Sequence, residues 1–284
     1  MRYQATHITR YGYSEPVAQS LSQAHITPRS FPGQRVVETH LEVQPHAAVF
    51  EQRVDYFGNI VTTFAVFQSH DHLSTTATSV VEVEPANFRQ TAIAWEDARA
   101  MLAAQTGEEC LEAYEFVFDS AFAGASHELA EYARAVFTPR RPLIEAAVEL
   151  SGLIHKEFRY QPKSTSIDMP LVEVLRNRTG VCQDFAHVMI GALRSLHLAA
   201  RYVSGYLRSN SNYQGAEASH AWVAVFIPGS GWLNLDPTNN VIPSDSHVTL
   251  AWGRDYGDVT PVKGITLGGG GQVVEVEVHV VACT

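Results

Sequence analysis

The stretch that decides the fold covers residues 179–196 and has the sequence TGVCQDFAHVMIGALRSL. Its apolar residues recur every three or four positions, which predicts an amphipathic helix with one buried face. Thr179 precedes this pattern and is predicted to cap the first turn. Cys182 would then lie among the unpaired backbone N–H groups of the helix N-terminus. The predicted buried face consists of Val181, Phe185, Val188, Met189, Ala192, Leu193 and Leu196.

Predicted helices precede this stretch and predicted strands follow it. Helices are expected from Ser126, as N-cap, to Phe137, and over residues 143–158 and 169–176. Helices followed by an antiparallel sheet predict an α+β domain over residues 126–284. The expected strands are 200–207, 220–227, 232–236 and 273–281.

The first 85 residues predict a small antiparallel β-sandwich domain, because short β-branched and aromatic runs alternate with turn signals. Gly58 and Asn59 mark one such turn. Residues 86–125 are predicted to be a connector with one helix near 95–105. The glycine run 268–271 predicts a loose hairpin loop.

The composition excludes several classes of protein. Apolar residues make up 45% of the 284 residues, which excludes a mainly disordered chain. Acidic residues outnumber basic ones by 30 to 20, and no basic run occurs, so nucleic-acid binding is not expected. No membrane span is expected either, because no apolar run approaches ~20 residues. No secretory signal is expected, because residues 1–10 are largely polar where a signal would be apolar. Three widely spaced cysteines (Cys110, Cys182 and Cys283) favour a reduced, cytoplasmic location over a disulfide scaffold.

Cys182 is the candidate nucleophile. The positive end of a helix dipole favours thiolate over thiol, and the same N–H groups could bind an oxyanion. On composition alone, a buried structural cysteine is the simpler interpretation. Gly180 and the polar Gln183 and Asp184 favour reactivity instead, because they would let a substrate approach closely.

A nucleophilic thiol needs a base, and the base needs an orienting group. His220 begins one predicted strand and Asp236 ends the next. A two- or four-residue loop between the strands would place these side chains on opposite faces. The catalytic interpretation therefore predicts an odd-length connection or a bulge near Gly229–Gly231. Taken singly, the histidine and the Asp-Pro-Thr sequence are ordinary strand and turn residues.

Four segments resemble the bacterial transglutaminase-like cysteine peptidase family: TGVCQDFAH (179–187), RYVSGY (201–206), SHAW (219–222) and DPT (236–238). GRDYGD (253–258) resembles that family's downstream signature, and the first 85 residues resemble the N-terminal region often joined to it. The resemblance implies a papain-like α+β fold. It also implies a Cys-His-Asp triad, carried onto Cys182, His220 and Asp236. The chain departs from the family at residues 196–200, LHLAA, where Gly-Ile-Pro-Ala is usual, so a turn behind the site is expected to differ.

The implied chemistry is acyl transfer with no cofactor and no metal. His220 would hold the thiolate and protonate the leaving amine, and Asp236 would orient the imidazole. One oxyanion donor would be the Cys182 N–H, whereas the second stays open among Gln183, Tyr160 and Gln161. Hydrolysis of a peptide, protein or small amide substrate is the prediction. The alternatives are a cross-linking transglutaminase, an arylamine N-acetyltransferase-like enzyme, and a non-catalytic binding or assembly module; the oligomeric state stays open.

Other polar residues have simpler interpretations. Asp184 and His187 are expected to make structural hydrogen bonds near the helix start, and Arg254 and Asp255 are expected to form a charge pair. The 13 histidines are scattered, and the sequence His70-Asp71-His72 lacks a third ligand at metal-binding spacing.

Overall fold

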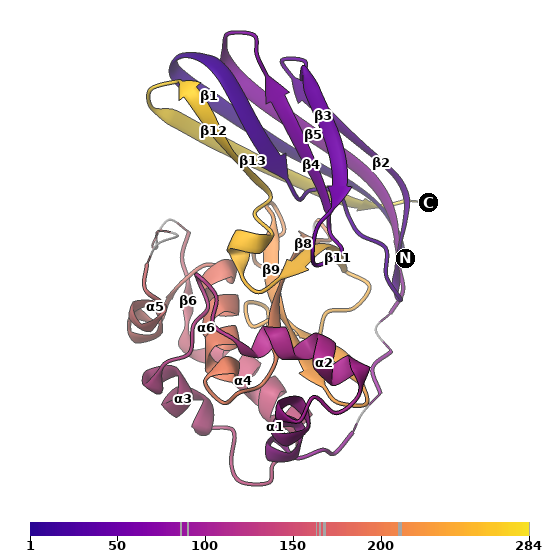
Figure 1. Cartoon of the computed structure of the whole chain (residues 1–284), viewed down its shortest axis with the longest axis vertical. Helices are drawn as coiled ribbons and strands as arrows, with labels where there is room; N and C mark the ends of the chain where they lie inside the picture. The colour runs from indigo at the N-terminus through magenta and orange to yellow at the C-terminus, as the bar shows by residue number, and fades with distance from the viewer. Residues whose placement is uncertain are drawn as a thin grey trace.

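The computed structural model describes residues 1–283 except 86, 90, 163, 165, 167, 168, 210 and 211. An antiparallel sheet built from both ends of the chain lies above a layer of helices and a second antiparallel sheet (Figure 1). This arrangement confirms the predicted α+β class with an associated antiparallel β unit. Among the described residues, no helix is long and apolar enough to cross a membrane.

The upper sheet is organised around one long strand, β1. The first part of β1 pairs with β5 along one edge and with β13 along the other, and its last part pairs with β4 and β12. Shifts of register near Val17 mark the bend between the two parts. Leu41, Phe64 and Leu73 meet in one apolar cluster, so the bent sheet encloses its own core. The strands are β1 (Arg2–Ala24), β2 (Gln34–Gln44), β3 (Val49–Val54), β4 (Ile60–Val66), β5 (His70–Val83), β12 (Val262–Gly268) and β13 (Gln272–Ala282).

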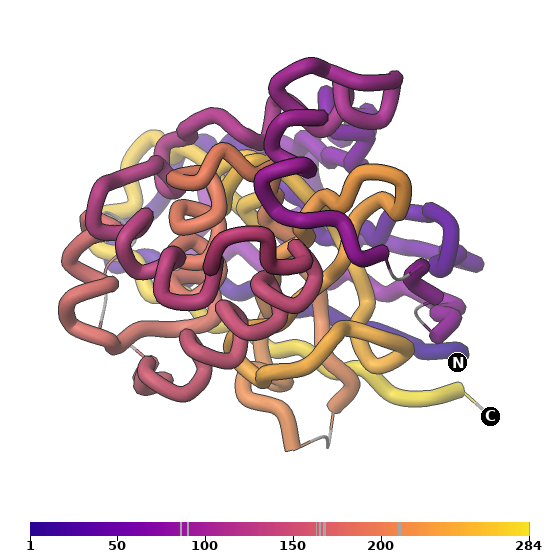
Figure 2. The backbone as a smooth tube through the Cα atoms, turned by 90° about the horizontal axis from the view of Figure 1, so that it is seen from below, coloured from indigo at the N-terminus to yellow at the C-terminus, as the bar shows by residue number. Residues whose placement is uncertain are grey.

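The prediction of a hairpin loop at residues 268–271 is wrong. β12 and β13 run in the same direction along β1, so the glycines interrupt one long strand instead of reversing it. Gly268, Gly269 and Gly270 have positive φ, which lets the strand follow the bend of β1. The predicted strand 273–281 therefore completes the upper sheet, although the sequence placed it in the C-terminal domain. Figure 2 shows the two chain ends side by side as a result.

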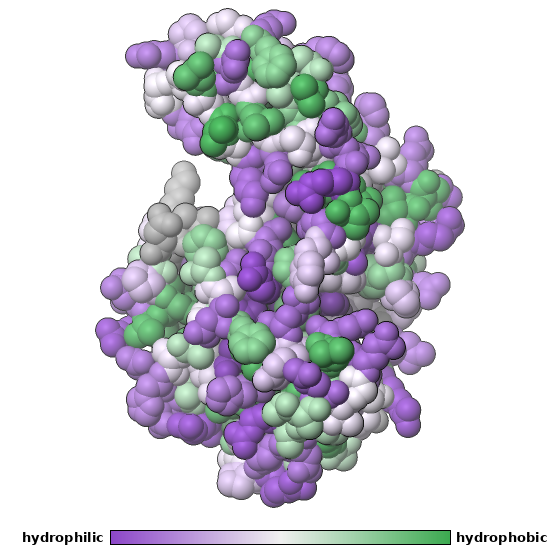
Figure 3. Space-filling model, in the orientation of Figure 1, coloured by the Kyte–Doolittle hydropathy of each residue, from purple (hydrophilic) through white to green (hydrophobic). Residues whose placement is uncertain are grey.

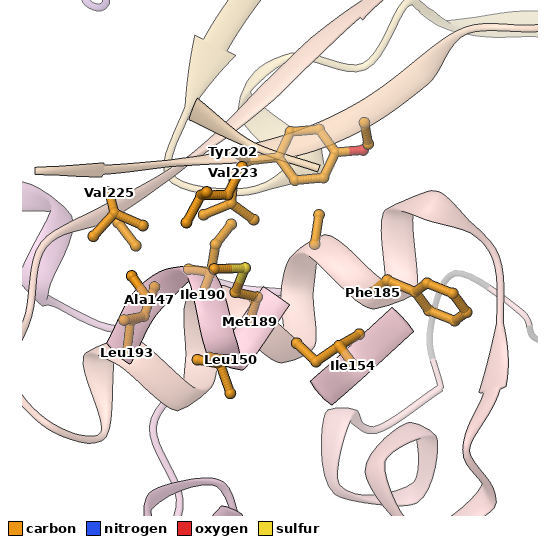
Figure 4. Packing of buried hydrophobic residues seen from close by; sticks show 14 of the residues in the cluster. Ala147, Leu150, Ile154, Phe185, Met189, Ile190, Leu193, Tyr202, Val223 and Val225 are labelled. Atoms are coloured by element: carbon orange, nitrogen blue, oxygen red, sulfur yellow. The ribbon is translucent and has the colours of Figure 1, made fainter. Parts of the chain in front are cut away.

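The lower sheet has the order β10-β9-β8-β11. Its strands are β8 (Ala200–Leu207), β9 (His220–Ile227), β10 (Gly231–Leu235) and β11 (His247–Gly253). The decisive helix is α6 (Cys182–Arg194), and it packs between this sheet and α4 (Leu143–Glu157) (Figure 4). Met189 and Ile190 of α6 lie near Tyr202 and Val223 of the sheet, as the apolar pattern of α6 requires.

Shorter elements surround α6. Ser126 caps α3 as predicted, because its Oγ accepts the Leu129 N–H at 3.1 Å. Helix α1 lies where one connector helix was expected, whereas α2, β11 and β12 were not predicted. The remaining elements are α1 (Trp95–Ala103), α2 (Glu108–Tyr114), η1 (Glu115–Val117), α3 (His127–Arg134), β6 (Arg159–Tyr160), α5 (Leu171–Asn177), β7 (Thr179–Gly180) and η2 (Tyr256–Asp258).

Arg194 fixes the far end of α6. Its side chain is buried and hydrogen-bonds to four backbone carbonyls and to the Ser120 hydroxyl. Burial lowers the pKa of this guanidinium to about 10. Because the accepting carbonyls belong to Phe116, Ala123, Ala200 and Arg254, one side chain ties α6 to the connector, to β8 and to the segment after β11.

Two side-chain amides join the upper sheet to the free edge of β11. Gln34 accepts the Thr249 N–H at 2.8 Å and donates to the Thr249 carbonyl at 2.7 Å. Asn59 likewise accepts the Trp252 N–H at 3.0 Å and donates to the Trp252 carbonyl at 2.8 Å. The turn at Gly58 was predicted, and the fully buried Asn59 serves both this contact and the turn, because it also hydrogen-bonds to Asp55. The amides therefore satisfy an edge strand that would otherwise be unpaired.

Replacing Asn59 by alanine should destabilise the protein by about 3 kcal/mol, because it leaves the partly buried backbone N–H and C=O of Trp252 without partners and removes the side-chain bonds of Asn59 to Asp55 and Arg29. The free energy of unfolding, measured by urea denaturation, checks this value. Gln52→Ala is the matched control, since Gln52 is exposed and bonds to one hydroxyl, Thr62 Oγ1. Equal effects of the two substitutions would contradict this account of the junction.

Candidate active site

Cys182 is the first residue of α6, whereas a cap at Thr179 would have made it the third. The predicted Thr179 cap is wrong, because Thr179 lies in β7 and donates its hydroxyl to the Asn177 carbonyl. Val181 is the N-cap, and the Asp184 carboxylate accepts its N–H at 2.8 Å. Residues at the start of a helix have N–H groups without intrahelical partners, so the sulfur still lies at the positive end of the helix.

Gly180 serves the helix cap. A Cβ at Gly180 would lie 2.5 Å from Asp184 Oδ2, so the capping carboxylate fills the space that a side chain would take. The expectation that this glycine leaves room for substrate is therefore wrong. Asp184 has the structural role that the sequence favoured.

The hairpin between β9 and β10 has the odd-length connection that the sequence predicted. Gly231 pairs with Ile227, so residues 228–230 form a three-residue loop, with positive φ at Gly229 and Gly231. This register places His220 and Asp236 on the same face of the hairpin. His220 Nε2 donates to Asp236 Oδ2 at 2.8 Å.

The Asp236 carboxylate is completely buried and bonds to several groups. Oδ1 accepts the backbone N–H groups of Thr238 (2.9 Å) and Asn239 (3.2 Å). Oδ2 accepts His220, the Asn239 side-chain amide (2.8 Å) and, more distantly, His247 Nε2 (3.4 Å). Although burial raises the pKa of Asp236, His220 and these hydrogen bonds outweigh it and hold the carboxylate ionised.

Sequence reasoning missed Asn239 and His247. Asn239 follows the DPT segment directly, so its position near the carboxylate could have been suspected. Its side-chain Oδ1 also accepts the Gln214 N–H at 2.8 Å, which ties the loop before His220 to the site. His247 begins β11, a strand that was not predicted, and no local signal indicated it.

His220 is buried and charged. Burial lowers its pKa, but the charges of Asp236 and Cys182 more than compensate and raise it to about 10. Its second ring nitrogen, Nδ1, is buried and has no partner of full hydrogen-bond geometry among the described residues, but the Cys182 side chain is close enough to raise the pKa of His220 as a hydrogen-bond partner. Gly215 lies against this nitrogen, and the Trp222 ring stacks parallel to the imidazole at 6.2 Å. Since Nε2 is engaged by Asp236, Nδ1 is the nitrogen left for the sulfur.

Two tyrosines complete the surroundings of Cys182, which is 8% exposed. Burial, followed by the charge of Cys182, raises the pKa of Tyr160 to about 12 and that of Tyr202 well above its usual value. Both phenols therefore stay protonated beside the sulfur. The backbone N–H of Gln161 donates to the Gly180 carbonyl at 2.8 Å, so this N–H is not available to an oxyanion.

His187 makes the kind of structural hydrogen bond that the sequence favoured. Its Nε2 accepts the Tyr256 N–H at 3.2 Å, and burial lowers its pKa to about 4, so the ring is neutral. The predicted pairing of Arg254 with Asp255 is wrong. Arg254 pairs with Asp258 across η2, with Nε–Oδ2 and Nη2–Oδ1 distances of 2.9 and 3.0 Å, whereas Asp255 caps η2.

Over the described part of the chain, no three His, Cys, Asp or Glu side chains are grouped to hold a metal ion. His70 and His72 bond instead to Gln68 and Asp71.

Comparison with known proteins places the chain in a family. Residues 130–237 match the Transglutaminase-like superfamily, and residues 3–82 match the Bacterial transglutaminase-like N-terminal region. An uncharacterized protein of Mycobacterium tuberculosis is 37% identical over 295 residues, which cover 99% of this chain and 92% of the relative. An uncharacterized Mycobacterium leprae protein is 31% identical, with 98% of both chains covered.

Two further similarities are to proteins with functional names. The structure of a proposed cysteine protease from Cytophaga hutchinsonii shares the fold, with a TM-score of 0.79, 19% identity, and coverage of 99% of this chain and 90% of the other. A Pseudomonas aeruginosa protein-glutamine gamma-glutamyltransferase is 32% identical over 111 residues, which cover 36% of this chain and 17% of that protein. The chain therefore belongs to the transglutaminase-like superfamily, and these similarities support cysteine-based acyl transfer in general.

Proposed function

We propose that the protein is a cysteine-dependent acyl-transfer enzyme that uses Cys182, His220 and Asp236 and hydrolyses a peptide or other amide. The observation that carries this proposal is the buried His220–Asp236 ion pair, whose free ring nitrogen lies near a cysteine at a helix N-terminus. A structural cysteine would not require a buried charged imidazole beside it. Burying that charge costs free energy, which the neighbouring carboxylate offsets.

In the first half of the reaction, the Cys182 thiolate attacks the amide carbonyl and forms a C–S bond. The helix N–H groups stabilise the oxyanion, and the Tyr160 hydroxyl, which burial keeps protonated, is the candidate second donor. The C–N bond then breaks as His220 gives its proton to the leaving amine. Asp236 keeps the imidazole oriented throughout.

In the second half, His220 takes one proton from water, which attacks the thioester; the C–S bond breaks and releases a carboxylic acid and the Cys182 thiolate, so the starting ion pair is restored. An amine in place of water would give a cross-linked amide instead. The name of the Pseudomonas relative favours this second candidate, with glutamine as the acyl donor. We also propose a cytoplasmic location, since the three cysteines are unpaired.

Iodoacetamide at pH 6 should modify Cys182 at least about tenfold faster than Cys110 or Cys283, because an unactivated thiol is almost fully protonated at this pH. Mass spectrometry of the digested protein gives the three rates. Cys283 is a demanding internal reference, because it is more exposed than Cys182.

His220→Ala should remove this preference while circular dichroism shows the fold intact. Similar slow rates at all three cysteines, or fast labelling of Cys182 that survives in the variant, would exclude an activated thiolate held by His220.

The His220 charge should make stability depend on pH. Because folding raises the pKa of His220 above its ordinary value of 6.5, its contribution is complete below about pH 6.5 and is lost as the pH rises toward about 10. In the Cys182→Ser protein Asp236 still raises the pKa of His220, although to a lower value than with Cys182 present. This protein should therefore lose stability relative to Cys182→Ser/His220→Gln by up to ~1.4 kcal/mol per pH unit as the pH rises above 6.5, over a range that ends below pH 10. Urea unfolding of both at pH 6, 7, 8 and 9 tests the slope. A difference independent of pH would refute the charged state of His220.

The acyl acceptor can be identified with a blocked glutaminyl-glycine peptide, with and without cadaverine. Hydrolysis predicts ammonia release with a glutamate product in both cases. Transfer to amine predicts a cadaverine adduct, detected by mass, that Cys182→Ser cannot form.

A further inference from the structure

A pocket lies away from the proposed active site, where the upper sheet meets the lower layer. It has a volume of about 700 Å³, within the usual range for small-molecule sites. Tyr56 and Phe57, in the turn between β3 and β4, form one wall, and Leu111 and Phe116 form another. In Figure 1 the lower end of β3 stands above α2, and Figure 3 shows apolar side chains at the surface of this junction.

Arg201 of β8 lies at the base of the pocket between two indole rings. Its guanidinium carbon is 4.1 Å from the centroid of the Trp232 ring and 3.9 Å from that of the Trp252 ring. The Arg29 guanidinium lies 3.2 Å from the same Trp252 ring. Two guanidinium groups this close to one ring would overlap on a single face, so they occupy opposite faces. The order of the stack is therefore Arg29, Trp252, Arg201 and Trp232.

The Arg201 cation lacks a counter-charge. Over the residues that the structure describes, it forms no salt bridge and no hydrogen bond, and its buried Nε has no acceptor. Burial, together with the charge of Arg29, lowers the pKa of Arg201 well below its usual value. Arg29 has its own partners, the Phe57 carbonyl and Asn59 Oδ1, although its Nε is also unpartnered. Aromatic faces offset part of the cost of burying Arg201, but they leave its N–H donors unused.

Two carboxylates at the pocket wall do not neutralise Arg201. Glu115 accepts a hydrogen bond from the Tyr56 hydroxyl, and burial raises its pKa although the charge of Arg254 opposes this. Glu112 is exposed on α2. Neither contributes to the pKa of Arg201. An anion entering between the aromatic walls would therefore meet the guanidinium without displacing an existing ion pair.

We propose that this pocket binds a carboxylate carried on an aromatic or apolar body, with Arg201 holding the carboxylate and the ring of the ligand packed against the aromatic walls. A guanidinium offers a planar pair of N–H donors that matches a carboxylate. The pocket is distinct from the proposed active site. Arg201 projects from the face of β8 opposite to Tyr202, which faces Cys182 and α6.

Two sources share this chemistry: a free aryl carboxylate and the C-terminal residue of a peptide. Isothermal titration of the full-length protein with N-acetyl-L-phenylalanine, and with N-acetyl-triglycyl-L-phenylalanine, distinguishes them. The pocket should bind at least one of these probes saturably below about 10 mM. Tighter binding of the tetrapeptide identifies a peptide C-terminus as the ligand, and tighter binding of the single amino acid identifies a small molecule.

N-acetyl-L-phenylalanine amide is the matched control ligand, because it keeps the ring and lacks the charge. It should bind at least about tenfold more weakly than the acid. Arg201→Met should weaken binding of the acid by a similar factor, whereas Arg35→Met, which removes an exposed arginine paired with Glu82, should leave it unchanged.

Equal affinity for acid and amide, or no saturable binding of either probe, would overturn the proposal. The comparison of acid with amide uses the unaltered protein, so it decides the matter even if Arg201→Met fails to fold. Binding that is unchanged in a folded Arg201→Met protein would also overturn it.

Discussion

The buried carboxylate of Asp236 is the constraint on which the candidate site depends. An ionised carboxylate without exposed surface is costly unless hydrogen bonds satisfy its oxygens. Here the partners come from the start of β9, from the turn that follows β10 and from the start of β11. One charge therefore fixes three segments of chain relative to one another. It also accounts for the three-residue hairpin, because an even loop would turn His220 away and leave the charge without its cationic partner.

Features set by local sequence could be predicted, and features set by distant partners could not. The apolar period of α6 and the glycines of the β9–β10 loop act within a few residues, so the helix and the hairpin register follow from the sequence. The cap of α6 does not, because Thr179 is drawn into β7 by pairing with Arg159, twenty positions earlier, which leaves the cap to Asp184. The hairpin loop predicted at residues 268–271 is wrong for the same reason, because distant pairing with β1 decides the path of these glycines. Four consecutive glycines usually mark a reversal, and only the bend of β1 makes them a kink.

The junction between the two sheets is built from polar side chains rather than from an apolar interface alone. Gln34 and Asn59 supply the donors and acceptors that a neighbouring strand would supply to β11. Arg29 adds a cation over the Trp252 ring. Such bonds require correct geometry on both sides, so the two sheets hold each other in one fixed relation. An edge strand that would invite association with other chains is thereby closed within the molecule.

The return of β12 and β13 to β1 has a consequence for how the chain is made. β1 is synthesised long before β12 and β13, the strands that cover one of its edges. Until β12 and β13 are made, the nascent chain would therefore carry a long, unsatisfied backbone edge on β1. A stalled or prematurely terminated product keeps that edge open permanently. Synthesis of β12 and β13 thus separates the closed sheet from an aggregation-prone intermediate.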